Sequence, residues 1–147
     1  MNNPNTKSSV FNIEGATAAT IMWILAILVS FTRVSFVIVI ISILILLNEK
    51  SSDFFRNHVS QLLSLSIIYT LIDILFIVLF GSSSIFFFKV IIVITAFVSK
   101  ILRIVLSLLK ASFCLMGLSR AMDKRDLALP FFSSFAEGLE RSITPES

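Results

Sequence analysis

The sequence predicts an all-α membrane protein with about four transmembrane helices and both termini on the same side of the bilayer. Three observations support this fold class. Of the 147 residues, 56% are hydrophobic, and the mean hydropathy is +0.99. Charged residues make up only 14%, whereas soluble domains contain about 25%. Long stretches contain almost no charge, so we expect lipid to solvate them.

The same composition argues against several classes of function. A net charge of +3 without a basic block gives no reason to expect a nucleic-acid partner. Cys114 is the only cysteine and His58 the only histidine, so the sequence suggests neither a disulfide within the chain nor a metal site. It contains no serine-hydrolase elbow, P-loop or dinucleotide fingerprint. We therefore expect no enzyme activity, no catalytic residues and no cofactor.

The first half of the predicted membrane domain over 16–122 contains a long apolar stretch. Residues 1–15 are polar and are expected to form a mobile tail, whereas 16–47 is almost entirely apolar apart from Arg33. One helix over that stretch would reach about 48 Å, more than a hydrocarbon core of about 30 Å. Two short helices, over 16–32 and 34–47, would instead form a hairpin. The hairpin is favoured because Arg at a helix centre costs roughly 2.5–3.5 kcal/mol.

The second half contains two longer helical segments. A charged connection over 48–60 leads into a helix over 54–80, which ends near Gly81. The helical pattern over 85–122 is too long for one straight span. It is either one extended helix that bends or a span followed by an interfacial segment, and the sequence leaves both open. Residues 123–147 are expected to form a polar tail.

Loop charges predict the orientation. Four spans place both termini and the 48–60 connection on one side. The basic residues on that side are Lys7, Lys50, Arg56, Arg120, Lys124 and Arg125, and those on the other are Arg33 and Lys89. Cytoplasmic loops carry the excess of Lys and Arg. The termini are therefore predicted to be cytoplasmic, in a bacterial inner membrane.

A basic stripe follows one face of the last long helix. At 100° per residue, Lys89, Lys100, Arg103, Ser107 and Lys110 lie within an arc of about 80°. The small residues that continue this stripe are Ala96, Cys114 and Ala121. The stripe either lines a hydrated cavity or binds an anionic headgroup, substrate or partner. Alternatively, it is a packing seam whose long basic side chains reach the interface, and this interpretation is favoured.

Asp73 is the one acidic residue within an apolar span. The polar residues that share its face are Ser66, Tyr69 and Thr70. A carboxylate in lipid must be neutralised or paired, so we expect Lys100 or Arg103 to pair with it. Asp73, Lys100, Arg103, Ser107 and Lys110 thus form a candidate intramembrane polar network. A proton relay at Asp73 is a less favoured alternative.

His58 and Gln61 lie on adjacent turns at the start of the third predicted helix. Their side chains are expected to form hydrogen bonds with backbone groups at the membrane interface. We treat the two residues as a candidate interfacial motif.

Two stretches resemble a known family. Residues 49–63 are similar to a loop pattern of phenylalanine, two further residues, then His-x-x-Gln-Ala-Leu. The matching residues are Phe55, His58, Gln61 and Leu63, and in the second stretch, 119–135, they are Arg120, Ala121 and Pro130. The family consists of small bacterial membrane proteins of unknown function. It is related to the four-helix subunit of the chloroplast inner-envelope protein-import translocon. The resemblance implies a four-helix fold with cytoplasmic termini and assigns no catalytic residues.

We therefore expect a structural or accessory subunit of a larger membrane complex, and the resemblance adds a link to protein translocation. The expected partners are the lipid bilayer and either other membrane-protein subunits or further copies of this chain. The alternative is a channel or transporter component whose basic stripe selects anionic solutes or lipids. A third interpretation is an envelope-stress or lipid-binding factor.

Overall fold

The computed structural model describes residues 3–30, 35–81, 89–129 and 132–143. The all-α class is confirmed, because these residues form five helices and no strand. The helices are α1 (Gly15–Ser30), α2 (Ser35–Asn48), α3 (Asp53–Gly81), α4 (Lys89–Met122) and α5 (Ser133–Ile143).

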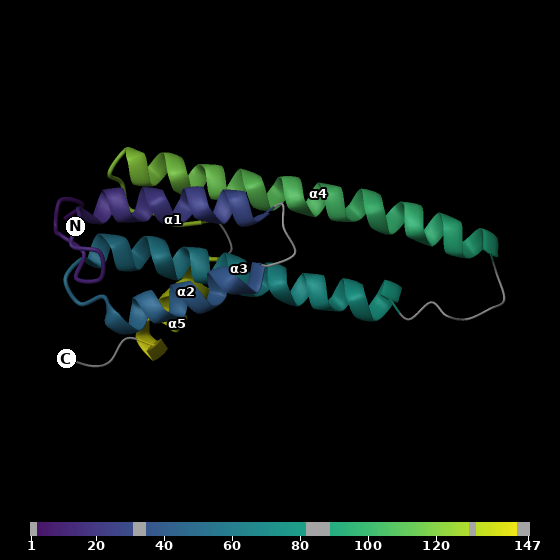
Figure 1. The fold of residues 1–147 in the computed structure, drawn as a ribbon, viewed down its shortest axis with the longest axis horizontal. Coiled ribbons are helices and arrows are strands. Elements are labelled where there is room, and N and C mark those ends of the chain that lie inside the picture. The colour runs from purple at the N-terminus through teal and green to yellow at the C-terminus, as the bar shows by residue number, and fades with distance from the viewer. Residues whose placement is uncertain (1–2, 31–34, 82–88, 130–131, 144–147) are drawn as a thin grey trace.

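The helices form an elongated bundle in which α3 is central, since it packs against each of the other four. Helix α1 lies along α4, and α2 lies along α3, with α5 on the side of α2 and α3 (Figure 1). The described chain begins and ends at the same end of this bundle (Figure 1). We call this end the closed end.

The helices differ greatly in length. With 16 and 14 residues, α1 and α2 are about 24 and 21 Å long, whereas α3 and α4, with 29 and 34 residues, reach about 44 and 51 Å. Helices α3 and α4 therefore continue beyond α1 and α2 as a two-helix arm (Figure 1). Among the described residues, two helical segments, Asp53–Leu79 of α3 and Val93–Met122 of α4, are long and apolar enough to cross a membrane.

The apolar stretch over 16–47 forms two helices and not one. Glu49, just after α2, accepts a hydrogen bond from the backbone N–H of Ser9, which precedes α1, at 2.9 Å. The end of α2 therefore lies beside the start of α1, as in an antiparallel hairpin. Arg33 lies outside the described residues. The stretch over 85–122 forms one continuous helix from Lys89 onward, and residues 85–88 lie outside the described part.

A close approach between α1 and α4 forms the core of the bundle. Trp23 on α1 is fully buried, and a Cβ atom added to Gly117 on α4 would lie 2.4 Å from its indole ring. Only a residue without a side chain leaves room for the indole here. Apart from Trp23 and Met22, the buried residues of α1 are small: Gly15, Ala16, Ala18, Ala19, Ala26 and Ser30. Large side chains would keep the two helices apart.

The expectation of a polar C-terminal tail over 123–147 is wrong, because part of it is the helix α5. Phe132 and Ala136 are buried, and Leu139 and Ile143 pack against the core. This spacing of three and four residues gives an amphipathic helix with one apolar face. Many polar residues on its other face conceal it in a hydropathy profile. An ion pair between Arg56 on α3 and Glu140, at 3.2 Å, also attaches it to the bundle.

The N-terminal segment also differs from the expected mobile tail. Residues 3–14 form turns, in which the N–H of Ser8 bonds to the carbonyl of Ile13 at 2.8 Å and that of Gly15 to Thr6 at 3.0 Å. The segment folds back because its serines reach Glu49 across the closed end.

Candidate functional site

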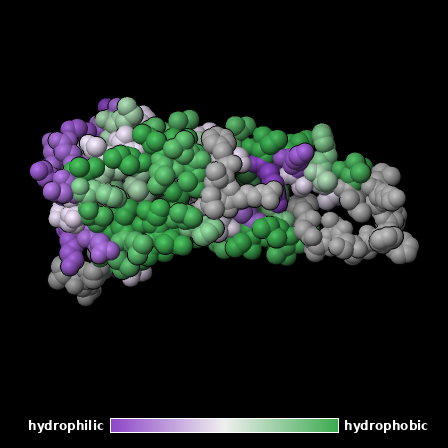
Figure 2. Space-filling view, in the orientation of Figure 1, coloured by the Kyte–Doolittle hydropathy of each residue, from purple (hydrophilic) through white to green (hydrophobic). Residues whose placement is uncertain are grey.

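A cleft of about 740 Å³ lies between α3 and α4 where the arm leaves the bundle. We call it the basic cleft. Its lining residues are Ser30, Tyr69, Ile72, Asp73, Phe76, Ile77, Lys100, Arg103, Ile104, Leu106, Ser107, Leu108 and Lys110. In Figure 2 a hydrophilic patch lies part of the way along the arm, with hydrophobic surface on both sides. The site is therefore polar in an otherwise apolar half of the molecule.

Helix periodicity places the lining residues. On α3, Tyr69, Asp73 and Phe76 are four and three residues apart and so share one face. On α4, Lys100, Arg103, Ser107 and Lys110 face them across the cleft. The structure thus brings all five residues of the predicted polar network to one cleft. The side chain of Lys89 lies outside the described residues.

The cleft has one buried end and one open end. Lys110 is 6% exposed and its Nζ lies 5.6 Å from the ring centre of Tyr69, which is 7% exposed. Asp73, Lys100 and Arg103 are exposed at the other end. Beyond the buried end, the Oγ of Ser30 lies 3.9 Å from the Sγ of Cys114, and Cys114 is fully buried. The basic cleft is thus closed toward the bundle and open along the arm.

The expected ion pair of Asp73 with Lys100 or Arg103 is not formed. Within the described part of the chain, ion pairs join Arg56 to Asp53 and Glu140, and Lys124 to Glu14. The guanidinium of Arg103 instead lies 5.6 Å from the ring centre of Phe76, in a cation–π arrangement. Phe76 is nearly one turn beyond Asp73, so the register of α3 and α4 favours the ring over the carboxylate.

Positive charge predominates in the basic cleft. Three of its charged side chains, Lys100, Arg103 and Lys110, are basic, and only Asp73 is acidic. With all four ionised, the excess is two positive charges. Charged residues between apolar helices are costly and typically face a ligand, a partner or water. Chemically, the site can bind an anion.

A second polar cluster lies at the closed end, around His58. The Nε1–H of Trp23 donates a hydrogen bond to Nδ1 of His58 at 3.1 Å. The Nε2 of His58 lies 3.0 Å from the carbonyl oxygen of Arg125. One ring nitrogen accepts and the other must donate, so the ring is the neutral form protonated at Nε2. His58 lies on α3 and is 1% exposed. Its two hydrogen bonds join α3 to α1 and to the connection after α4.

Asn57 and Gln61 extend this contact along α3. The backbone N–H of Leu127 donates to Asn57 Oδ1 at 3.1 Å, and that of Leu129 donates to Gln61 Oε1 at 3.3 Å. Residues 125, 127 and 129 alternate, as in an extended chain. His58 and Gln61 thus bind backbone groups of the α4–α5 connection. No local sequence signal marks Asn57 or Trp23 for this role, because their partners are distant in sequence.

Glu49 is a third polar site, which was not predicted from the sequence. It is 1% exposed, and its carboxylate accepts hydrogen bonds from the hydroxyl of Ser8 and from the backbone N–H groups of Ser51 and Ser52, at 3.0 and 3.1 Å. Burial raises the pKa of Glu49, but these hydrogen bonds outweigh it and hold the pKa below its usual 4.5. The signal was a Glu two residues before a Ser–Ser pair at a helix start.

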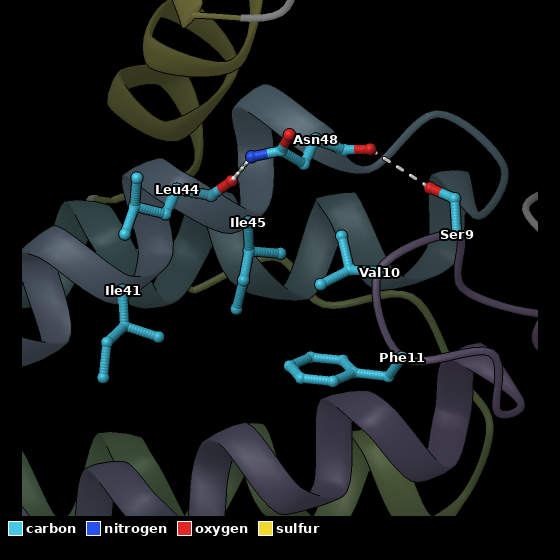
Figure 3. Close-up of a pocket in the computed structure, with 7 residues that line it drawn as sticks. All are labelled: Ser9, Val10, Phe11, Ile41, Leu44, Ile45 and Asn48. Carbon is cyan, nitrogen blue, oxygen red and sulfur yellow. Dashed lines mark hydrogen bonds between the residues drawn. The ribbon is translucent and has the colours of Figure 1, made fainter.

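A shallow groove beside Glu49 lies between the N-terminal segment and α2. Figure 3 shows Val10 and Phe11 beside Ile45, with the Ser9 hydroxyl bonded to the Asn48 carbonyl at 3.2 Å. The groove encloses about 460 Å³, and its lining contains no charged side chain. It is a packing feature of the closed end.

No family model, curated protein or solved structure matches this chain. The resemblance of residues 49–63 and 119–135 to the small bacterial membrane-protein family thus stays a prediction.

Proposed function

We propose that this chain is an integral membrane protein with α1 to α4 in the bilayer, and that it serves as an accessory subunit of a larger membrane complex. Large apolar side chains face outward along α1 and α2, and this supports a lipid environment around the bundle. Leu28 is 65% exposed, Ile40 is 52% exposed and Leu44 is 54% exposed. A monomeric soluble protein rarely exposes so large a contiguous apolar surface.

The observation that supports a partner subunit is the position of the basic cleft along the arm. Asp73 lies twenty residues beyond Asp53, about 30 Å along α3, which already equals one hydrocarbon core. The arm continues past this level with the apolar residues of 74–79 and 93–99. We call these two segments the arm tip. A bilayer that covers the closed-end bundle leaves the arm tip outside its core, and helices of a partner subunit would cover it.

Photo-crosslinking tests the partner subunit. A photoreactive amino acid replaces Val93 or Phe97 at the arm tip, and matched positions on the bundle surface are Ile24 and Leu44, 46% and 54% exposed. We expect a discrete protein adduct from the arm tip only. Lipid adducts alone at all four positions would contradict the proposal.

The second candidate function is a solute pathway, and the volume and charge of the basic cleft favour it. Its closed inner end argues against it, because Lys110 and Cys114 are buried there. Lys100→Cys, Arg103→Cys and Ser107→Cys, each with Cys114→Ser, would be treated with membrane-impermeant thiol reagents. Labelling of one position from both sides indicates a pathway, whereas labelling from one side at most indicates a blind site. A link to protein translocation rests on the sequence resemblance alone.

A further inference from the structure

We infer that the basic cleft binds the phosphate headgroup of an anionic phospholipid, whose acyl chains lie along the apolar surface of α4 from the cleft toward the bundle. The inference rests on the membrane location proposed above but not on the partner subunit. The cleft combines three features that such a ligand requires. It has excess positive charge, hydrogen-bond donors at its open end and an apolar flank.

The charge balance defines the ligand as an anion. Lys100 and Arg103 lie at the open end, and no described carboxylate comes within 4.0 Å of either. Lys100 and Arg103 therefore offer two positive charges to a ligand at the open end. A phosphate monoester carries close to two negative charges at neutral pH. A phospholipid with a phosphate monoester headgroup therefore matches these two side chains in charge.

The donors are arranged to bind a phosphate. Lys100 and Arg103 are three residues apart on α4, so their side chains lie on adjacent turns of one face. Ser107 adds a hydroxyl one turn further in. The Cζ of Arg103 lies over the Phe76 ring, 5.6 Å from its centre, and this cation–π contact holds the guanidinium in the cleft. A guanidinium edge binds two phosphate oxygens at once.

The surroundings favour a lipid over free phosphate. Ile104 and Leu108 line the cleft on its bundle side and are 57% and 59% exposed, so the rim is apolar toward the bilayer core. An acyl chain gains free energy by covering such side chains, whereas an inorganic ion does not. The buried inner end is the wall against which the headgroup would stop.

Native mass spectrometry of the full chain in a mild non-ionic detergent tests the site. The probe is dioleoyl phosphatidate in mixed micelles, with dioleoyl phosphatidylcholine and inorganic phosphate as separate arms. We expect phosphatidate to bind at least tenfold more tightly than phosphatidylcholine, and millimolar inorganic phosphate not to displace it. Equal affinity for the two lipids, or displacement by inorganic phosphate, would overturn the inference.

The variant K100Q/R103Q tests the residues. Both side chains are exposed, and we expect at least tenfold weaker phosphatidate binding. Arg120→Gln, an exposed basic position on the same helix outside the cleft, is the matched control and should bind like the wild type. Unchanged affinity of the double variant overturns the assignment. If the double variant does not fold, Lys100→Gln alone should weaken binding about threefold, and no change would count against the site.

Carbonate extraction of the wild-type membrane fraction separates the two proposals. A chain that resists extraction but does not prefer phosphatidate retains its membrane location and refutes only the lipid site. A chain released into the soluble fraction refutes the proposed membrane location itself.

Discussion

At the residue scale, two buried polar side chains fix segments that the hydropathy profile would leave loose. Glu49 accepts hydrogen bonds from Ser8 and from Ser52. His58 forms hydrogen bonds with Trp23 and with the carbonyl of Arg125. Each has its hydrogen-bonding capacity used within the fold, which is what burial of such groups requires. Removal of either side chain therefore leaves its hydrogen-bond partners unsatisfied.

Glu49→Gln is expected to destabilise the fold by about 2 kcal/mol, because charge-assisted hydrogen bonds from the serines are replaced by weaker ones. Since the folded pKa of Glu49 lies below its unfolded value of 4.5, its stabilising contribution is complete above about pH 4.5 and is lost as the pH falls through the folded pKa. Unfolding followed by the fluorescence of Trp23, between pH 3 and 7, measures both effects. Glu137→Gln, at an exposed position on α5, is the control. Equal pH profiles for wild type and E49Q would refute the role of Glu49.

His58→Phe is expected to destabilise the fold by about 2–4 kcal/mol, because it leaves both the Trp23 N–H and the Arg125 carbonyl unsatisfied. The α4–α5 connection should also become sensitive to trypsin after Lys124 and Arg125. Trp23→Phe removes only one donor, so this variant should retain trypsin resistance of the connection. The same cleavage rate in H58F and wild type would show that His58 does not secure that connection.

At the element scale, the periodicity and length of the apolar segments predicted the long helices and their faces. They did not predict which residues of two neighbouring helices contact each other. An angle of 100° per residue was enough to place Lys100, Arg103, Ser107 and Lys110 on one face of α4. Whether Arg103 meets Asp73 or Phe76 depends on the axial register of α3 and α4, which no local pattern encodes. The helix α5 was missed because its apolar residues are few. Glu49 was missed because its donors come from a segment some forty residues earlier.

Gly117→Leu is expected to destabilise the contact between α1 and α4 by about 1–3 kcal/mol or more, because its side chain would overlap the Trp23 indole. Thermal unfolding in detergent measures the loss. Gly138→Ala is the matched control, since no atom lies within 4 Å of its Cβ position, and it should stabilise α5 by about 0.5–1 kcal/mol. Rescue of G117L by W23L would link the loss to this contact, and a loss of the same size in W23L/G117L would argue against it.

At the scale of the whole molecule, the unequal helices set the relation to the bilayer. Helices α1 and α2 are shorter than a hydrocarbon core of about 30 Å, and short helices are accommodated by local thinning or by association. Composition predicted the lipid environment, and the count of loop charges predicted an orientation. Neither could predict how far the arm extends beyond the bundle, because this depends on where α1 and α2 end in space.

The proposed topology predicts the behaviour of reporter fusions. A fluorescent protein fused after residue 147 should mature, and alkaline phosphatase there should be inactive, because the cytoplasmic side carries most of the basic residues. Alkaline phosphatase inserted between α3 and α4, after Gly81, should be active. Activity at residue 147 would contradict the four-span arrangement with cytoplasmic termini.

The bonds from Asn57, His58 and Gln61 hold α3 to the connection that follows α4 at the closed end. His58 can therefore act as a pivot, with Phe76 about 27 Å away along α3. A rotation of α3 by about 5° at this pivot moves the level of Phe76 by about 2 Å. Small packing changes around Trp23 are therefore amplified into a wider or narrower gap between Phe76 and Arg103.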